Sequence, residues 1–163
     1  MNVSKLLFFD CETTGLPRSR DIPIEDVDAW PRLVQIAWAR YDLQGNPQGS
    51  RCHIIRPEGF VIPTEATKIH GITHAQALRS GRAAAEVLEE FLEEAERPAT
   101  TLIAHNLDFD RGVVGAELVR LGRSLRFLEA PGICTMRSTT ELCQLPRPGG
   151  FGFKWPTLEE LHL

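Results

Sequence analysis

The sequence predicts an α/β domain in which a mixed sheet of about five strands is flanked by helices. Three observations carry this prediction. Strand-like segments fill residues 5–57, helical patterns dominate after Pro63, and a short apolar segment at 100–105 separates two of the helices. We expect residues 1–163 to form one domain, because this length suits one hydrophobic core and no repeat or linker divides the chain.

Three strands are expected before Pro63, arranged as a meander. Residues 5–9, KLLFF, form an apolar run typical of a buried strand, which we expect to end at Asp10. Residues 16–31 are rich in proline and aspartate and predict a surface loop. Residues 32–41 have the alternating pattern of a second strand, and the turn sequence QGNPQGS leads into a returning strand, RCHIIRP.

The second half predicts helices that alternate with short strands. Residues 83–96 and 109–122 have the apolar periodicity of amphipathic helices. Apolar residues at 100–105 and near Ile133 predict two further strands. A last helix is expected to begin near Pro156, since proline is favoured in the first turn of a helix.

Composition and charge exclude several classes of protein. The net charge is −4, so a nucleic-acid partner would have to bind a local basic surface, and a non-specific architectural binder is disfavoured. The four cysteines show no CxxC spacing, which indicates reduced thiols. No apolar run is long enough for a signal-peptide core or a membrane span. We therefore expect a cytoplasmic protein with no membrane partner.

Two carboxylates follow the first predicted strand. Asp10 and Glu12 are two residues apart, so on an extended backbone both point to the same side. Two like charges at this distance are unfavourable unless a cation lies between them, and Mg²⁺ or Mn²⁺ takes such oxygen ligands. Taken alone, this pattern is more often an ordinary strand-end pair, in which Asp10 caps the residues that follow.

The next residues favour a binding site at this strand end. Thr13, Thr14 and Gly15 supply hydroxyls, backbone N–H groups and a residue that accepts a positive φ. Such a turn can approach a phosphate or a sugar, and Leu16 offers an apolar surface to a base. The same sequence also fits an unremarkable turn.

A second group of polar residues follows the strand at 100–105. Ligands of open α/β sheets bind at such strand ends, and Asn106 or Asp108 is a candidate cap for the next helix. Asp110 could then face the site. The structural alternative is a cap followed by a helix acid in a salt bridge.

One histidine and four arginines are weaker candidates for functional residues. His70 lies in the segment PTEATKIHGIT, where a lone histidine is more often an ordinary loop residue. The candidates for a basic track along a nucleic-acid backbone are Arg111, Arg120, Arg123 and Arg126. Arg120 and Arg123 fit a solvent-facing helix surface at least as well.

Four segments carry a resemblance to a known family. FFDCETTGL, PRLVQIAW, EATKIHGIT and LIAHNLDFDRGVV occur in the order and approximate spacing of the DnaQ-like (DEDDh-type) 3′–5′ exonucleases. The chain resembles this family over nearly its whole length. The resemblance implies a ribonuclease H-like fold.

The resemblance also implies roles for individual residues. Asp10, Glu12 and Asp110 match catalytic carboxylates that bind two Mg²⁺ or Mn²⁺ ions, which activate a water and stabilise the leaving 3′ oxygen. The positions that match substrate contacts are Thr13, Leu16, Glu65, His70, Ile72 and Asn106. Of these, Leu16 and Ile72 would enclose the terminal base.

The implied activity is hydrolysis of 3′-terminal phosphodiesters of DNA or RNA, with release of nucleoside monophosphates. The substrate would be a nucleic acid with a free, single-stranded 3′ end. DNA repair or proofreading beside a polymerase or a repair complex is the implied setting. The alternative is a catalytically degenerate module on the same fold that binds nucleic acid or protein.

One family motif has no match. The third motif is a histidine followed five residues later by an aspartate on the last helix, and after residue 110 no such pair occurs. His162 is no substitute, because it falls in the preceding LEELH segment. The sequence stops within a helical pattern, so we expect a fragment with a truncated C-terminal helix and impaired catalysis.

Overall fold

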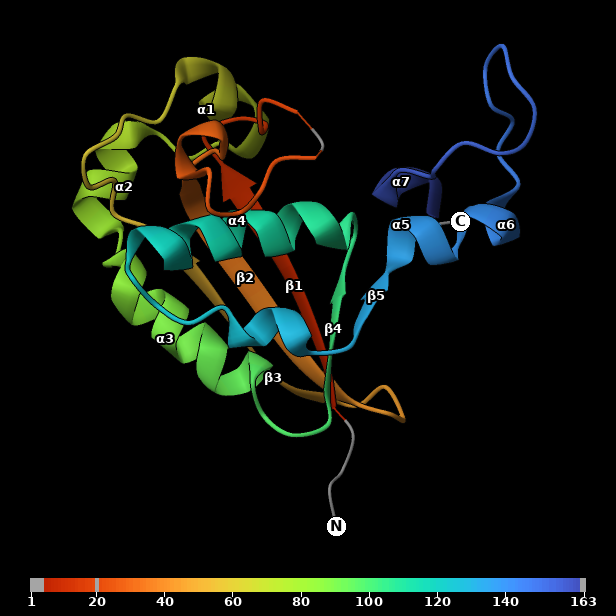
Figure 1. Cartoon of the computed structure of the whole chain (residues 1–163), viewed down its shortest axis with the longest axis horizontal. Coiled ribbons are helices and arrows are strands. Elements are labelled where there is room, and N and C mark those ends of the chain that lie inside the picture. The colour runs from red at the N-terminus through yellow and green to blue at the C-terminus, as the bar shows by residue number, and fades with distance from the viewer. Residues whose placement is uncertain (1–4, 20, 162–163) are drawn as a thin grey trace.

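The computed structural model describes residues 5–19 and 21–161 and confirms the predicted fold class. A five-stranded mixed sheet has the order β3-β2-β1-β4-β5 (Figure 1). The strands are β1 (Lys5–Thr13), β2 (Leu33–Asp42), β3 (Pro47–Ile54), β4 (Thr100–Ala104) and β5 (Gly132–Cys134). β1, β2 and β3 pair antiparallel as the predicted meander, whereas β4 and β5 are parallel to β1.

Helices cover one face of the sheet and extend beyond its edges. α3 and α4 lie across the sheet, α1 and α2 lie beside the end of β1, and α5–α7 lie beyond β5 (Figure 1). The longer helices are α1 (Thr64–His70), α2 (His74–Ser80), α3 (Ala84–Ala95) and α4 (Leu107–Arg120). The short ones are η1 (Val27–Ala29), η2 (Arg126–Glu129), α5 (Thr135–Ser138), α6 (Thr140–Cys143) and α7 (Leu158–Leu161). Within the described residues, no helix is long and apolar enough to cross a membrane.

The alternation along β1 separates the core from the opposite face of the sheet. Leu7, Phe9 and Cys11 are buried in the main hydrophobic cluster, together with residues of α3 and α4. Asp10 and Glu12 occupy the alternate positions and point to the other side. The apolar residues of β1 therefore fix the direction of its carboxylates.

A second, smaller cluster fixes the position of α1. Val34 of β2 packs with Ile62, Ala66, Ile72 and Ala77, which belong to α1, α2 and the segments beside them. This contact places α1 against the same end of the sheet at which β1 finishes (Figure 1).

Expected boundaries of β1, β3 and α4 were wrong. β3 begins at Pro47, within the expected turn, and ends at Ile54. β1 continues past Asp10 to Thr13, because its pairing with β2 extends to Thr13↔Leu33 through a bulge. α4 begins at Leu107 rather than 109 and ends at Arg120. The predicted strand near Ile133 is present as β5. His162 lies outside the described residues.

The expected surface loop at 16–31 in fact covers a helix. Ala29 and Trp30 are buried, and Trp30 lies directly against Gly112 of α4. This covering layer explains why α4 is buried on most of its surface, although its sequence was predicted to be amphipathic.

Gly112 should be the glycine of α4 least tolerant of a side chain. A Cβ built at this position would overlap the ring of Trp30, which has no room to move in the core. We expect Gly112→Ala to lower the free energy of unfolding by about 1–3 kcal/mol, measured by urea denaturation. In the control Gly115→Ala, the new Cβ would lie 3.0 Å from the flexible side chain of Ile24, so a smaller loss is expected. Equal losses would contradict this explanation.

Candidate active site

Parallel pairing brings the two polar segments to one edge of the sheet. The last β1–β4 pair is Phe8↔Ile103, so both strands end at the same side. β1 continues beyond this pair and carries Asp10 and Glu12, while β4 leads directly into α4 and Asp110. The structure thus places the two predicted groups of polar residues at the same end of the sheet.

Asp110 is anchored to the backbone of β1. Its carboxylate is 1% exposed, and Oδ1 accepts a hydrogen bond of 3.0 Å from the N–H of Cys11. This N–H lies past the last β1–β4 pair, so the carboxylate takes the place of a strand partner. Asp108, in contrast, is exposed and pairs with Arg137 at 2.5 Å. Of the two acids in the first turn of α4, only Asp110 therefore points into the protein.

The local electrostatics disfavour negative charge on these groups. Burial, and then the charge of Asp10, raise the pKa of Asp110 to about 8. Desolvation also raises the pKa of Asp10, with His105 opposing the rise. The pKa of Glu12 is raised by desolvation and by Asp10, while His70 opposes. Each carboxylate is therefore a group that a nearby cation would stabilise.

The chemistry of the donor set fits a hard divalent cation. Asp10, Glu12 and Asp110 offer only carboxylate oxygens, the ligands that Mg²⁺ and Mn²⁺ prefer. Their convergence is incomplete: among the described residues, no three histidine, cysteine, aspartate or glutamate side chains lie close enough together to hold a metal ion. The Asp110 carboxylate is bound to the N–H of Cys11, which accounts for part of this incomplete convergence.

The turn after β1 is ordered by its own hydrogen bonds. The Thr13 hydroxyl donates to the Gly15 carbonyl oxygen at 2.6 Å, and the Thr13 side chain is almost completely buried. Leu16 is 84% exposed, so its apolar side chain lies in water three residues after Thr13. Of the two, Leu16 is the one with a surface free to contact a ligand.

Asn106 occupies the N-cap position of α4 without capping it. Its backbone is left-handed, with φ 73°, and its side chain makes no capping hydrogen bond. Asparagine tolerates this conformation better than most residues. The expectation that Asn106 or Asp108 caps the helix through its side chain was wrong.

α1 and the residues directly after it carry three further predicted site residues, of which His70 lies near Glu12. His70 Nδ1 accepts a hydrogen bond of 3.0 Å from the N–H of Ile72, so the neutral ring carries its proton on Nε2. That Nε2 is buried and has no partner among the described residues. Glu65 is exposed in the first turn of the helix. Ile72 is only 5% exposed because it packs in the smaller cluster, so little of it can reach a base.

His105 is a residue that sequence reasoning missed. It follows β4 directly, and its Nδ1 lies 3.1 Å from Thr135 Oγ1 while its Nε2 lies 3.0 Å from the Pro156 carbonyl oxygen. We call the end of the sheet that carries Asp10, Glu12 and Asp110 the carboxylate edge. His105 connects this edge to α5 and to the segment before α7. Its place directly after an apolar strand was the available signal.

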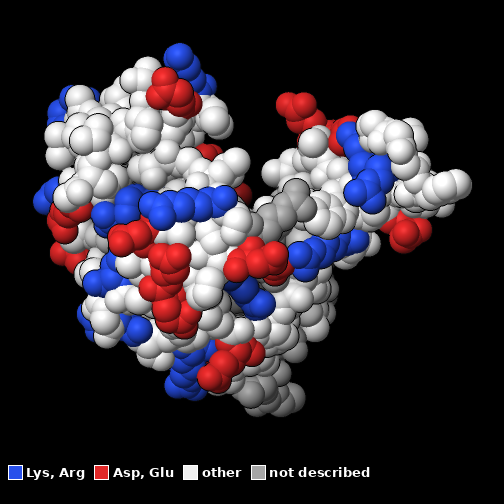
Figure 2. All heavy atoms as spheres, turned by 45° about the horizontal axis from the view of Figure 1, so that its top comes forward, with Lys and Arg blue, Asp and Glu red and all other residues white. Residues whose placement is uncertain are grey.

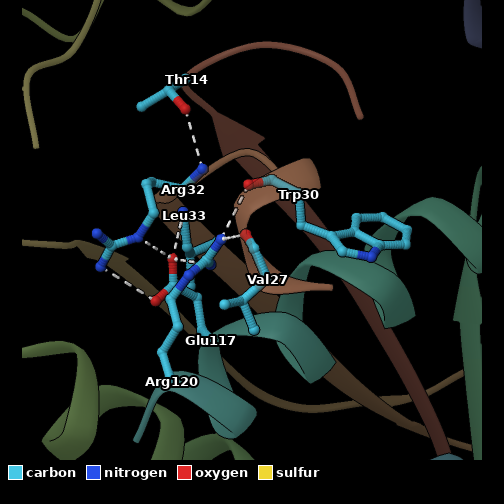
Figure 3. A network of polar contacts seen from close by, with 7 residues as sticks. All are labelled: Thr14, Val27, Trp30, Arg32, Leu33, Glu117 and Arg120. Carbon is cyan, nitrogen blue, oxygen red and sulfur yellow. Dashed lines mark hydrogen bonds and ion pairs between the residues drawn. The ribbon is translucent and has the colours of Figure 1, made fainter. Parts of the chain in front are cut away.

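The predicted basic track is not formed as a row of free arginines. Arg120 is half-buried and donates to Glu117 and to the carbonyl oxygens of Val27 and Trp30 (Figure 3). Arg111 donates to the Ala130 carbonyl oxygen at 2.5 Å. Both side chains therefore hold the fold together, and the expectation of a solvent-facing surface at Arg120 was wrong.

Asp10 is exposed and Glu12 is partly exposed, whereas Asp110 is buried. Figure 2 shows a hollow between the main body and the C-terminal segments, with acidic side chains at its margin. A separate cavity of about 380 Å³ lies beside α3 and is lined among others by Trp38, Arg40 and Glu94. It includes none of the predicted site residues.

Comparisons with known proteins identify the family and agree with the fold. The exonuclease family model RNase_T matches residues 7–145. Among solved structures, E. coli exonuclease I in complex with a dA16 oligonucleotide is similar, with a TM-score of 0.78 and 20% identity over 97% of this chain and 35% of that chain. A product-bound exonuclease I has a TM-score of 0.75 and 22% identity over 98% and 35%. The zinc-bound E. coli ExoI–ssDNA complex has a TM-score of 0.73 and 22% identity over 91% and 31%.

The similarity to the solved structures covers part of their length and concerns their fold. The chain spans about a third of the length of the solved structures that it matches. At this level of identity the likeness concerns the fold. No curated protein sequence matches the chain significantly.

Proposed function

Because the chain belongs to the RNase_T exonuclease family, we propose that it hydrolyses 3′-terminal phosphodiesters of nucleic acids and releases nucleoside monophosphates. The observation that supports this proposal is that β1 and the start of α4 place Asp10, Glu12 and the buried Asp110 at the same end of the sheet, with Asp110 bound to the backbone of β1. The site would take a single-stranded 3′ end; the similar exonuclease I forms a complex with single-stranded DNA, which supports the single-stranded part of this proposal.

Asp10, Glu12 and Asp110 would hold the divalent cations, Mg²⁺ or Mn²⁺, two to a site. Such ions make a water more acidic and stabilise the charge on a leaving oxygen. The chain itself supplies a fixed frame: β1 aims Asp10 and Glu12 to one side, and the Cys11 N–H holds Asp110 beside them. Fixed charges at this position act with little reorganisation during the reaction.

Other residues of the site would bind the terminal nucleotide. The buried His70 Nε2–H is a donor without a protein partner near Glu12 in the described part of the chain, and it would donate to a substrate oxygen. Leu16 would contact the base, and Asn106 would contact the sugar or the neighbouring phosphate. Thr13, Glu65 and Ile72 would contribute less to nucleotide binding. Thr13 and Ile72 are largely buried, and Glu65 is exposed in the first turn of α1.

The proposal extends to the rate and to the biological setting. For residues 1–163 taken by themselves the rate should be low, because within them no histidine after residue 110 is followed five residues later by an aspartate that could complete the set. General-base assistance alone contributes about 10²–10⁴-fold. The resemblance supports a cytoplasmic role in DNA repair or proofreading, alone or beside a polymerase, within one domain over 1–163.

The proposal is tested with 5′-labelled single-stranded DNA and RNA on a sequencing gel. In Mn²⁺ we expect a ladder that shortens from the 3′ end, and in EDTA we expect none. The comparison of the two substrates shows which sugar the site accepts. Binding of the oligonucleotides without any ladder would instead support the second candidate, a nucleic-acid-binding module, which the incomplete convergence of acids in the described residues favours.

A further inference from the structure

α4 carries a second buried acid that the proposed chemistry does not use. Glu117 is 2% exposed and lies about two helical turns after Asp110, so both acids face the same side of the helix. Asp110 accepts the N–H of Cys11 in β1, and Glu117 Oε1 accepts the N–H of Leu33 in β2 at 3.1 Å. The two acids therefore fasten one helix to two neighbouring strands.

Glu117 also binds two arginines (Figure 3). The Nε of Arg32 lies 2.8 Å from Oε1 and one terminal nitrogen lies 3.3 Å from Oε2, which is a two-point contact. Arg120 donates to Oε1 at 2.9 Å and to the carbonyl oxygens of Val27 and Trp30. A buried carboxylate requires such partners, since its desolvation is otherwise costly. We call Arg32, Glu117 and Arg120 the Arg32 network.

Arg32 connects this network to the turn after β1. Its N–H donates to Thr14 Oγ1 at 2.9 Å, and the N–H of Thr14 donates to the Arg32 carbonyl oxygen at 2.9 Å. Thr14 is two residues from Glu12 and two from the exposed Leu16. The backbone of Arg32 thus holds the middle of the turn from both sides.

The side chain of Arg32 also reaches the segment that carries α1. Its guanidinium lies 4.3 Å from the centre of the Phe60 ring, a cation–π contact. Phe60 packs against the smaller cluster, to which Ala66 and Ile72 of the α1 region belong. Arg32 therefore contacts the turn after β1 through its backbone and the α1 region through its side chain, which Glu117 holds in place.

We propose that Arg32, held by Glu117 and Arg120, is a positioning residue that fixes the turn 13–16 and α1 across the carboxylate edge. This inference rests on the proposed function, whose substrate contacts lie on these two segments. Arg32 itself points toward Glu117, so it acts by setting the distance between the walls of the nucleotide site. Small displacements of such walls have large effects, because binding geometry and reaction geometry are coupled.

Hydrogen–deuterium exchange tests the positioning directly, without requiring activity. Arg32→Met keeps much of the apolar stem but removes the contact with Glu117. We expect amide exchange to accelerate by about tenfold in residues 12–16 and 64–72, while the amide of Cys11 stays protected. Arg32→Lys, which keeps the charge for the buried Glu117 but not the two-point geometry, should give an intermediate change.

Arg40→Met is the matched control. The Arg40 side chain is 28% exposed, as is that of Arg32, and it contacts both carboxylate oxygens of Glu94, at 3.1 and 3.3 Å. It is distant from the turn 13–16, because it pairs with Leu7 in the β1–β2 register. Unchanged exchange at 12–16 and 64–72 in both Arg32 variants, or the same change in Arg40→Met, would overturn the proposal.

A binding measurement tests the consequence for the substrate. Fluorescence anisotropy with Ca²⁺ would compare an oligonucleotide with a normal 3′ nucleotide and one with a 3′ abasic residue. The wild type should prefer the normal end, and Arg32→Met should weaken that affinity by about tenfold with little effect on the abasic one. Equal losses on both would indicate general destabilisation and overturn the positioning role. If the wild type neither binds nor cleaves either strand, the proposed function fails, and the exchange experiment still decides whether Arg32 orders the turn.

Discussion

Replacing Asp10 by asparagine should lower the rate of 3′-end hydrolysis by about 10²–10³-fold, the scale on which single preorganised charges act in active sites. Asparagine keeps the shape of the side chain and one acceptor oxygen but removes the negative charge that attracts a divalent cation. The fold should be unaffected, because Asp10 points away from the core of β1. The measurement is the initial rate of shortening of a 5′-labelled strand in Mn²⁺.

The stability of the Asp10→Asn variant separates a lost ligand from a damaged fold. Because desolvation raises the pKa of Asp10, its charge is unfavourable in the metal-free protein. The variant should therefore unfold at the same temperature as the wild type in EDTA, or at a higher one. Asp21→Asn, in the exposed loop, is the control for the same change of charge and should keep the wild-type rate. Undiminished hydrolysis by Asp10→Asn would refute the assigned site.

Replacing Asp110 by asparagine should have two opposite effects, a more stable metal-free protein and a loss of the response to divalent cations. The pKa of Asp110 is about 8 in the folded chain, whereas an exposed aspartate has its ordinary value of 3.8. Between these pH values the unfolded state is ionised and the folded state keeps its proton. The wild type in EDTA should thus lose stability as the pH rises from about 4 to about 8, with a slope of at most about 1.4 kcal/mol per pH unit.

The amide introduced by Asp110→Asn does not titrate, so the variant should lack this slope while its amide oxygen still accepts the hydrogen bond of Cys11. A divalent cation favours ionised carboxylates, so Mn²⁺ should raise the melting temperature of the wild type and have little effect on Asp110→Asn. Thermal unfolding from pH 5 to 8, with EDTA or Mn²⁺, measures both effects. Asp108→Asn, on the same turn but exposed and paired with Arg137, should behave as the wild type. A variant that keeps the wild-type slope would show that Asp110 is not the titrating group.

The position of Asp10 and Glu12 was predictable from the sequence for a simple reason. The apolar residues of β1 alternate, so the direction of every second side chain is set once Leu7 and Phe9 are known to be buried. The parallel strand at 100–104 and its following helix were equally local signals. Position after the expected cap favoured Asp110 over Asp108 as the acid that faces the site, and the family resemblance implied the same choice.

The partners of the arginines and of Glu117 could not be predicted in the same way. Arg32 and Glu117 are far apart in sequence, and an acid followed by an arginine three residues later on a helix is typical of a surface pair. The covering of α4 by the segment around Trp30 turned that pair inward. Burial of Ile72 and the contacts of His105 have the same origin, in segments that meet only after folding.

The sequence by itself determined which residues face together within each strand and helix, because side-chain direction follows the local backbone period. It therefore contained the carboxylates, their strand ends and, through its motifs, the family. Only the tertiary structure decided which charges are buried and what they hold. Burial depends on how loops and helices pack across the sheet, and in this protein it made Glu117 a support and left Leu16 exposed.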